Sequence, residues 1–594
     1  MLFIGLRALF ICIGFLNVPA TARADLTPLS GAAVAPNIVE ITISENGVTV
    51  AMEIYVENIQ QFEDLLPDSW VPPGPMERWF EAKRLKRFAE QGLSIRIGEG
   101  ATLPVTVKTI EPRMRVDRAS PNAGKIDPIT GRMLPKPPED SRVIYAELFY
   151  DFGGHRPDKL EIIPPLNDEG DPILSIGMIL FDRDVAVTDF RYLSAVARLT
   201  IDWGDPWYSK FDNPNLRRHH RYPAMSFIYA EPYEIRHETL MRVRDAAELL
   251  GIELKGDYLT ADDRAAIDKA LPSFLNDSSP MTVDGKPAKP VFERMSYLKV
   301  GPSGLIFIED GKDLRTDAAI IGLVYSVPTM QFAKEATVEW TLFTDAIQKI
   351  PAQSIDAAGP FISELTPEEP ILIWTNYFKT YEPQVIAPVA YGKERTLDVP
   401  VITILLIVLT LGATALLFRS QTISGTIRIS VLGALVVAAG ASTQIGWITV
   451  ENPIASVPDE PSATRIAGQL IENFHNALQL KIPERLNAAL DTSVSAEAFE
   501  DVKQELERAV IVEMQGGGAG IVREIRDISV VNLRAASGAG GFQASVNWSV
   551  TAFGDHWGHP HQKNIRFSAL MDIAPISGAW KLTGITVTSA QPEI

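Results

Sequence analysis

The sequence predicts a multidomain protein that is rich in β-sandwich structure, with a two-helix transmembrane hairpin and a C-terminal α+β domain. Stretches of alternating apolar and polar residues recur before residue 398 and again near the C-terminus. Two uncharged apolar runs lie close together between these regions. The chain has 594 residues, more than one hydrophobic core normally supports, so we expect several domains.

The N-terminal segment, residues 1–24, has the pattern of a secretory signal peptide. It contains the basic residue Arg7, an apolar run and an Ala-x-Ala cleavage pattern that ends at Ala24. The chain's single cysteine, Cys12, lies inside this segment, so the mature chain would have no disulfide and no thiolate metal site. An exported chain of this size without disulfides indicates a bacterial envelope protein.

The charge of the mature chain excludes some partners. Removal of residues 1–24, which carry two arginines and no acid, leaves 53 basic and 74 acidic residues, a net charge of −21. A broadly acidic surface argues against nucleic acid as a partner and against general adhesion to anionic lipid.

Residues 25–205 are predicted to form a β-sandwich with one inserted helix. The stretch 38–56 shows two alternating strands around Asn46-Gly47, a strong hairpin signal. Residues 76–91 have helical periodicity and end before a glycine. Further strand patterns follow and are typical of a sandwich; they cover residues 142–152, 159–165, 173–182 and 196–203.

Residues 206–398 are predicted to contain a mixed helical and loop region and then a second β-rich domain. Residues 234–251 and 260–275 look helical, and Thr260 is a candidate cap for the second helix. Residues 276–290 have the composition of a linker, and they complete the mixed region 206–290. Strand patterns resume in residues 291–398.

The two apolar runs, residues 399–418 and 429–450, are each long enough to cross a bilayer as a helix. Their connector, residues 419–428, holds two arginines and no acid, which places it in the cytoplasm by the positive-inside rule. Both large regions would then lie in the periplasm, anchored to the bacterial inner membrane. Neither run carries an ionisable residue, which favours an anchor over a transporter.

Residues 451–594 are predicted to be an extracytoplasmic α+β domain. Helical periodicity over residues 463–513 is followed by clear strand alternation from residue 542 to the C-terminus. Helices followed by an antiparallel meander suggest a cone resembling nuclear transport factor 2, by analogy of fold alone.

A histidine cluster lies at a strand connection in this domain. Three of the chain's eight histidines fall within six positions: His556, His559 and His561. Three imidazoles could hold copper or zinc. On an extended backbone His556 faces away from the other two, so their convergence requires a bend, which Gly558 and Pro560 could supply. The alternative is a hairpin end packed around Trp557.

A basic patch is the second candidate site. It consists of Arg217, Arg218, His219, His220 and Arg221. These side chains could bind a carboxylate, a phosphate, a lipid head group or a partner protein, but an exposed loop whose arginines pair with nearby acids is the alternative. The stretch RHETLMR at 236–242 lacks the second histidine of a zinc-protease helix, because Met241 stands in its place.

The chain also resembles two families. The segments DWGDPWYSKFDNPNLRRHHRYPAMSFIYAEPYEIRHETLMRVRD and HWGHPHQKN, together with the paired spans, resemble a family of predicted bacterial two-span envelope membrane proteins. This resemblance implies no activity. Residues 38–203 also look like the exported domain of HupE/UreJ-like proteins. The histidine-bearing multi-span domain of those permeases is missing here, so their function is not implied.

We expect from these patterns a non-enzymatic, membrane-anchored scaffold that binds a protein partner or forms a homo-oligomer. A periplasmic copper- or zinc-handling protein that uses the histidine cluster is the first alternative. A membrane-anchored hydrolase is the second alternative, although no complete catalytic motif supports it.

Overall fold

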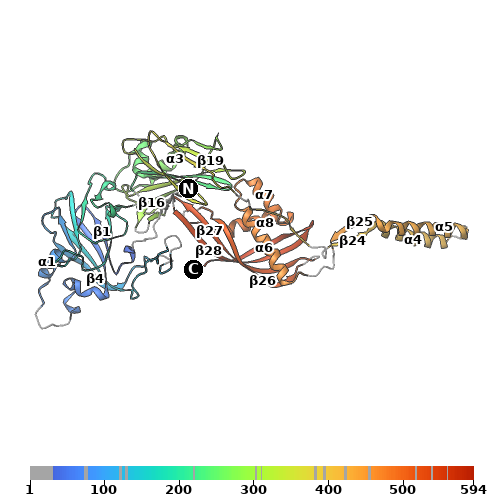
Figure 1. The fold of residues 1–594 in the computed structure, drawn as a ribbon, viewed down its shortest axis with the longest axis horizontal. Coiled ribbons are helices and arrows are strands. Elements are labelled where there is room, and N and C mark those ends of the chain that lie inside the picture. The colour runs from blue at the N-terminus through green and yellow to red at the C-terminus, as the bar shows by residue number, and fades with distance from the viewer. Residues whose placement is uncertain are drawn as a thin grey trace, which may run out of the picture. The chain divides into compact units, whose positions relative to one another are not determined.

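The protein folds into two units that each contain β-sheet (Figure 1), which confirms the multidomain, β-rich class. The computed structural model describes residues 31–593 except for 72–77, 120–122, 127–130, 219–220, 302–303, 310, 380–383, 392–395, 420–423, 452–456, 515–517, 537–539 and 558. The first unit takes the chain up to Val327, Phe332–Tyr377 and Asp555–Pro560; the second takes Pro328–Gln331, Phe378–Gly554 and His561–Ile594. The expected signal peptide lies outside the described residues.

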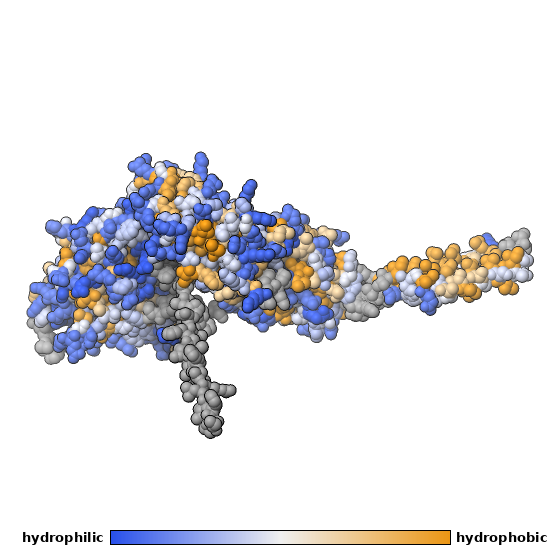
Figure 2. All heavy atoms as spheres, turned by 45° about the horizontal axis from the view of Figure 1, so that its top comes forward, coloured by the Kyte–Doolittle hydropathy of each residue, from blue (hydrophilic) through white to orange (hydrophobic). Residues whose placement is uncertain are grey.

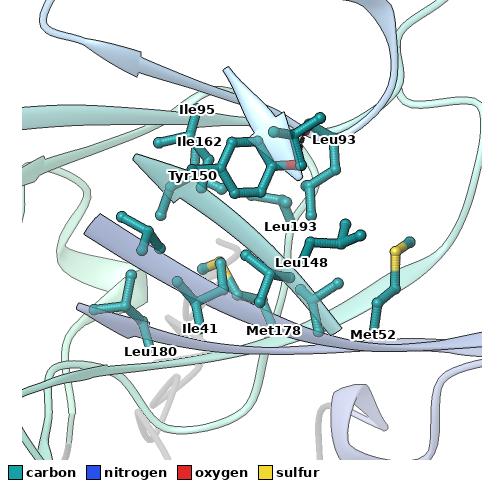
Figure 3. Packing of buried hydrophobic residues seen from close by; sticks show 14 of the residues in the cluster. Ile41, Met52, Leu93, Ile95, Leu148, Tyr150, Ile162, Met178, Leu180 and Leu193 are labelled. Atoms are coloured by element: carbon teal, nitrogen blue, oxygen red, sulfur yellow. Dashed lines mark hydrogen bonds between the residues drawn. The ribbon is translucent and has the colours of Figure 1, made fainter. Parts of the chain in front are cut away.

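The N-terminal part of the first unit consists of two sheets that enclose one apolar core. Figure 3 shows Tyr150 in this core, where its hydroxyl donates a hydrogen bond to the Leu93 carbonyl (2.6 Å). One sheet has the order β4-β5-β2-β1-β7-β8 with β9 beside β7, and the other has the order β11-β10-β6-β3. The strands are β1 (Asn37–Ile43), β2 (Gly47–Tyr55), β3 (Ser94–Ile97), β4 (Val105–Met114), β5 (Arg142–Asp151), β6 (Lys159–Ile163), β7 (Ile176–Asp182), β8 (Val185–Ala186), β9 (Arg191–Tyr192), β10 (Ala197–Thr200) and β11 (Lys210–Phe211).

The expected hairpin and the later strands of this region all form, whereas the helix is shorter than predicted. Helix α1 spans Glu81–Gln91, because Phe80 before it keeps an extended backbone (ψ 152°). Short 3-10 turns surround the sandwich: η1 (Ala32–Val34), η2 (Val56–Leu65), η3 (Asp68–Trp70), η4 (Pro206–Tyr208) and η5 (Pro214–Leu216).

The rest of the first unit is built on a seven-stranded sheet of order β17-β16-β18-β13-β12-β20-β21. One face of this sheet packs with a four-stranded sheet, β15-β14-β19-β22, and with α3 around a second core. The strands are β12 (Ala224–Glu231), β13 (Glu234–Arg242), β14 (Met281–Val283), β15 (Lys286–Pro287), β16 (Val291–Gly301), β17 (Gly304–Phe307), β18 (Ile320–Pro328), β19 (Glu335–Glu339), β20 (Ile350–Asp356), β21 (Gly359–Leu365) and β22 (Ile371–Thr375).

Two expectations for residues 206–290 were wrong. The first half of the expected helix 234–251 is strand β13, which is hydrogen-bonded between β12 and β18, and only α2 (Val243–Leu250) is helical. The expected linker contains the hairpin β14–β15, whose turn uses Asp284 and Gly285 at positive φ. Strands from both sides of residue 290 therefore share the seven-stranded sheet, and 206–290 is not a separate helical region.

Helix α3 (Ala261–Ser278) forms close to its predicted position. The Thr260 hydroxyl accepts from the backbone N–H of Asp263, while the Asp263 carboxylate accepts from the N–H of Thr260. This reciprocal capping satisfies two N–H groups that would otherwise lack partners, as the sequence indicated for Thr260.

Two helices of the second unit are long and apolar enough to cross a membrane: α4 (Val401–Arg419) and α5 (Gly425–Ala441), which η7 extends to Gln444. Only 6% of the apolar stretch of each helix is buried, and Figure 2 shows apolar side chains over their surface. The Thr403 and Ser442 hydroxyls are hydrogen-bonded to each other (2.9 Å).

The ends of the two apolar runs are not helical. Residues at their outer ends form an antiparallel ribbon of β24 (Thr396–Pro400) and β25 (Trp447–Glu451). Gly446, with a φ of 75°, separates β25 from η7 because a helix cannot continue through that conformation. The second helix therefore lies earlier in the chain than the predicted span 429–450.

The C-terminal part of the second unit is an α+β domain with a sheet of order β23-β29-β28-β27-β26. Helices α6 and α8 pack against this sheet around a core that includes Trp548, Phe567 and Phe474. The elements are α6 (Glu460–Ala477), α7 (Pro483–Asp491), η8 (Ala496–Ala498), α8 (Phe499–Ala509), β23 (Val389–Ala390), β26 (Ile521–Ala535), β27 (Phe542–His556), β28 (His559–Ile576) and β29 (Ala579–Pro592). The helices and the antiparallel strands form in the predicted order.

Candidate functional site

Trp557, at the connection between β27 and β28, is the anchor of the candidate site. Its backbone is in the left-handed region (φ 46°), which is uncommon for a tryptophan. Its side chain is 1% exposed and lies in an apolar cluster of the first unit. The short segment Asp555–Pro560 is thus an integral part of that unit.

Gly322 leaves the space in which the Trp557 ring packs. Phe307 of β17 packs against the indole, with ring centroids 5.3 Å apart. A Cβ atom added to Gly322 of β18 would lie 2.3 Å from Cζ2 of the indole. Gly322 is therefore required here because its missing side chain leaves the space that the ring fills.

A buried carboxylate holds the backbone of the same residue. The N–H of Trp557 donates to Oε2 of Glu238 (2.6 Å), and Nε of Arg236 donates to Oε1 (2.8 Å). Arg236 also pairs with Glu231 (3.2 Å), and its guanidinium lies 4.7 Å from the Tyr229 ring centroid. These contacts compensate a charge that would be very costly to bury alone.

The charges of this cluster shift one another's pKa values. Burial raises the pKa of Glu238, although Arg236 and the Trp557 N–H act in the opposite direction. For Arg236 burial acts to lower the pKa, but Glu231 and Glu238 outweigh it and the pKa is raised. Arg236 therefore stays charged, and both oxygens of Glu238 are occupied by structural donors.

The opposite face of the same sheet carries a buried pair that the sequence did not reveal, Ser226 of β12 and His237 of β13. The Ser226 hydroxyl lies 3.1 Å from Nε2 of His237, and Tyr325 stacks on the imidazole (6.2 Å between ring centroids). A hydroxyl and an imidazole at this distance can act as nucleophile and base. Both side chains are buried, however, and burial lowers the pKa of His237 to about 4, so we assign the pair a structural role.

The basic patch is not assembled as one surface. Arg218 is 5% exposed and donates to the carbonyls of Ala186 (2.8 Å) and Trp207 (2.6 Å). Burial, with a smaller contribution from Arg242, lowers its pKa to about 10. Arg218 is therefore a structural residue and is not available to an anion.

Arg217 and Arg221, in contrast, are exposed. The Arg221 guanidinium lies 5.3 Å from the Tyr222 ring centroid. His219 and His220 lie outside the described residues. Anion or partner binding by the exposed arginines stays a prediction.

A small cavity of about 10 Å³ is lined by Trp207, Leu240, Arg242 and Leu305. This volume holds about one water molecule, so it cannot accept an organic substrate.

His475 of α6 is a buried histidine of the second unit. The indole N–H of Trp548 donates to its Nε2 (3.1 Å), and Phe474 packs at 4.9 Å between ring centroids. Burial lowers the pKa of His475 to about 3. This imidazole is a neutral, hydrogen-bonded member of the core.

The three clustered histidines lie where the two long strands meet. His556 is the last residue of β27, and His559 and His561 open β28, but their side chains are outside the described part of the structure. Among the side chains that are described, His, Cys, Asp and Glu form no group of three that could hold a metal ion. Metal binding by the cluster therefore stays a prediction.

We predict that Gly322→Ala and Trp557→Ala are strongly coupled. Each alone should cost roughly 2–5 kcal/mol in the free energy of unfolding. The alanine at position 322 would displace the indole ring, and Trp557→Ala would leave a cavity where the ring packs. In the Trp557→Ala background, Gly322→Ala should cost almost nothing. A double-mutant cycle by denaturant unfolding checks this. Gly412→Ala is the control because open space surrounds that position, and additive costs would contradict the prediction.

We also predict that acid destabilises both units through their buried histidines. Because the folded-state pKa values of His237 and His475, about 4 and about 3, lie below the ordinary 6.5, unfolding takes up protons at acid pH. Each histidine should cost on the order of 2–3 kcal/mol of stability between pH 7.5 and 4.5.

Thermal unfolding at the two pH values measures this loss. Replacement of either buried histidine by glutamine should reduce the pH dependence, whereas replacement of the exposed His155 by glutamine should not. An unchanged pH dependence in both core variants would rule the explanation out.

The sequence was also compared with known proteins. No protein-family model and no curated protein matches it.

Proposed function

We propose that the protein is a membrane-anchored bacterial envelope protein that acts as a scaffold for partner proteins. One observation carries the proposal: residues before and after the two apolar helices belong to the same folding unit. Asp555–Pro560, which follow α5, complete the unit formed by residues that precede α4. The burial of Trp557 against Phe307 and Gly322 is the physical basis of this assignment.

Because residues on both sides of α4 and α5 belong to the first unit, a transmembrane hairpin is the topology that we favour. Two segments that pack into one core must lie on the same side of a bilayer, so the chain between them crosses an even number of times. The helices α4 and α5 supply two crossings. A transmembrane hairpin with both large regions on one side therefore follows from the proposal.

The charges at the ends of the helices support the orientation. Arg419 closes α4 and Arg428 lies in the first turn of α5, and the connector between the helices has no acidic residue. By the positive-inside rule this end of the hairpin lies in the cytoplasm. The two large regions would then lie in the periplasm, in agreement with the signal peptide expected at residues 1–24.

The composition of α4 and α5 favours a membrane anchor over a transporter. Neither helix carries an ionisable residue between Val401 and Phe418 or between Ile429 and Gln444. The polar contact between Thr403 and Ser442 joins the helices to each other and leaves their outer surfaces apolar. Ion or proton transport would require ionisable groups in the membrane.

The interiors of the extramembrane domains favour a binding role over catalysis. In the C-terminal domain, which we compare with the nuclear transport factor 2 cone, Trp548 and Phe567 stack with ring centroids 5.2 Å apart. Together with Phe474 they belong to the apolar core between helices and sheet, and we infer that this domain binds a partner through its outer surface. The buried Glu238 and His237 of the first unit are likewise committed to structural contacts.

Cross-linking on spheroplasts tests both the topology and the scaffold role. A membrane-impermeant, lysine-reactive cross-linker should reach exposed lysines such as Lys86, which is 76% exposed, and join the protein to a partner or a second copy. Failure of the reagent to modify the protein unless the cells are lysed would refute the periplasmic location. Modification without any adduct would refute the scaffold role.

A second candidate function is periplasmic handling of copper or zinc, favoured by the register of β27 and β28. Three side-chain hydrogen bonds share one register: Gln543 to Asp572 (2.8 Å), Ser568 to Asn547 (2.7 Å) and Thr551 to Asn564 (3.0 Å). Carried to the strand ends, this register sets His556 opposite His559.

Metal titration of the full chain tests this candidate. We expect one copper(II) or zinc ion to bind, followed by calorimetry and, for copper, by visible absorption. The variant His556→Ala/His559→Ala/His561→Ala should lose this binding, whereas His155→Ala should retain it. Equal affinity in the triple variant would exclude the cluster as the site.

A further inference from the structure

Three large aromatic side chains lie exposed near the start of α1, which is unusual for a well-packed sandwich. They are Trp70 (41% exposed), Trp79 (43%) and Phe80 (70%), and we call them the aromatic tip. Trp70 ends the turn η3, and the other two residues directly precede α1. Side chains of this size normally contribute to a core or to an interface.

A buried arginine holds the two segments of the aromatic tip together. Arg84 of α1 is 4% exposed; its Nε donates to the Trp79 carbonyl (2.9 Å) and its Nη2 pairs with Asp68 of η3 (3.0 Å). Arg78 pairs with the same carboxylate (2.7 Å). These contacts fix the backbone of both segments, so the aromatic rings are exposed on an ordered part of the protein.

Two cations of α1 lie against the aromatic tip. The Lys83 ammonium lies 3.6 Å from the Trp79 ring centroid and the Arg87 guanidinium lies 4.6 Å from it. Arg87 is also hydrogen-bonded to Asp64 (2.7 Å). Lys83 and Lys86 are exposed cations on the same helix, and Lys86 lies 4.0 Å from Glu90, so binding at this surface rests mainly on the aromatic rings.

We propose that the aromatic tip contacts the interface of the lipid bilayer that holds α4 and α5. Tryptophan suits the headgroup region because its ring is apolar and its N–H is polar, and flanking lysines can reach phosphate groups. The proposal rests on the membrane anchoring proposed above. A tether to the same bilayer gives the tip a high effective concentration of its ligand, so that weak contacts suffice.

The negative charge of the chain indicates which lipids the aromatic tip would contact. A protein with a net charge of −19 is repelled by anionic lipid, so the contact should not require an anionic headgroup. It should also depend little on salt, in contrast to binding by a basic patch.

The test uses the full chain, reconstituted in phosphatidylcholine vesicles, with Cys12→Ser as background where that residue is retained. A fluorophore is attached at Phe80→Cys, at Phe361→Cys as a matched aromatic position of β21 (49% exposed), or at Leu411→Cys in α4. Lipids with a nitroxide in the headgroup or in the acyl chain are included in the bilayer. Headgroup nitroxides should quench position 80 several-fold more than position 361, and Trp70→Ala/Trp79→Ala should remove that difference.

The outcomes separate this proposal from membrane anchoring itself. Failure of the acyl-chain nitroxide to quench position 411 would overturn the anchoring. Quenching at position 411 together with equal quenching at positions 80 and 361 would overturn the aromatic-tip proposal alone. Quenching of position 80 only by added vesicles, and not by the host bilayer, would also overturn it. Thermal unfolding of each labelled chain verifies that the fold is kept.

Discussion

The hydrogen bond from the Trp557 N–H to the carboxylate of Glu238 is the constraint on which the first unit depends. A fully buried carboxylate needs donors on both oxygens: Arg236 donates to Oε1 of Glu238, and the Trp557 N–H donates to Oε2. The second donor comes from a residue more than three hundred positions later in the chain. The first unit therefore reaches its final packing only after the segment that carries Trp557 has been made.

This constraint also limits how the chain can pass through a membrane. The segments that share the core of the first unit are separated by α4 and α5, whose apolar surfaces are uncovered in the protein. If those helices insert, packing in one core requires that they return the chain to the side from which it came. The ribbon β24–β25 must then lie outside the hydrocarbon, because its open edges could not be satisfied by lipid.

Polar residues in the interior mainly serve this architecture. His237, Arg218 and His475 are buried and hydrogen-bonded to groups of their own domain, and burial lowers the pKa of each. Such groups resemble catalytic residues when they are seen in isolation. Their partners are a core hydroxyl, two backbone carbonyls and a core indole. These three residues therefore help to fix how the core packs.

The sequence by itself determined the features that are encoded locally. Alternating apolar residues predicted β1, β2, β5, β27 and β28, the capping pattern predicted the start of α3, and uncharged length predicted the two apolar helices. It misjudged β13, because charged residues such as Glu234 and Arg236 are rare in a buried strand and the stretch has few helix breakers. Only the tertiary structure decided three features. Glu238 accepts a hydrogen bond from the Trp557 N–H, Arg218 is buried, and Arg84 holds the two segments that carry the exposed tryptophans. These arrangements join residues that are distant in the chain or adjust to a local packing environment, and no local periodicity records such contacts.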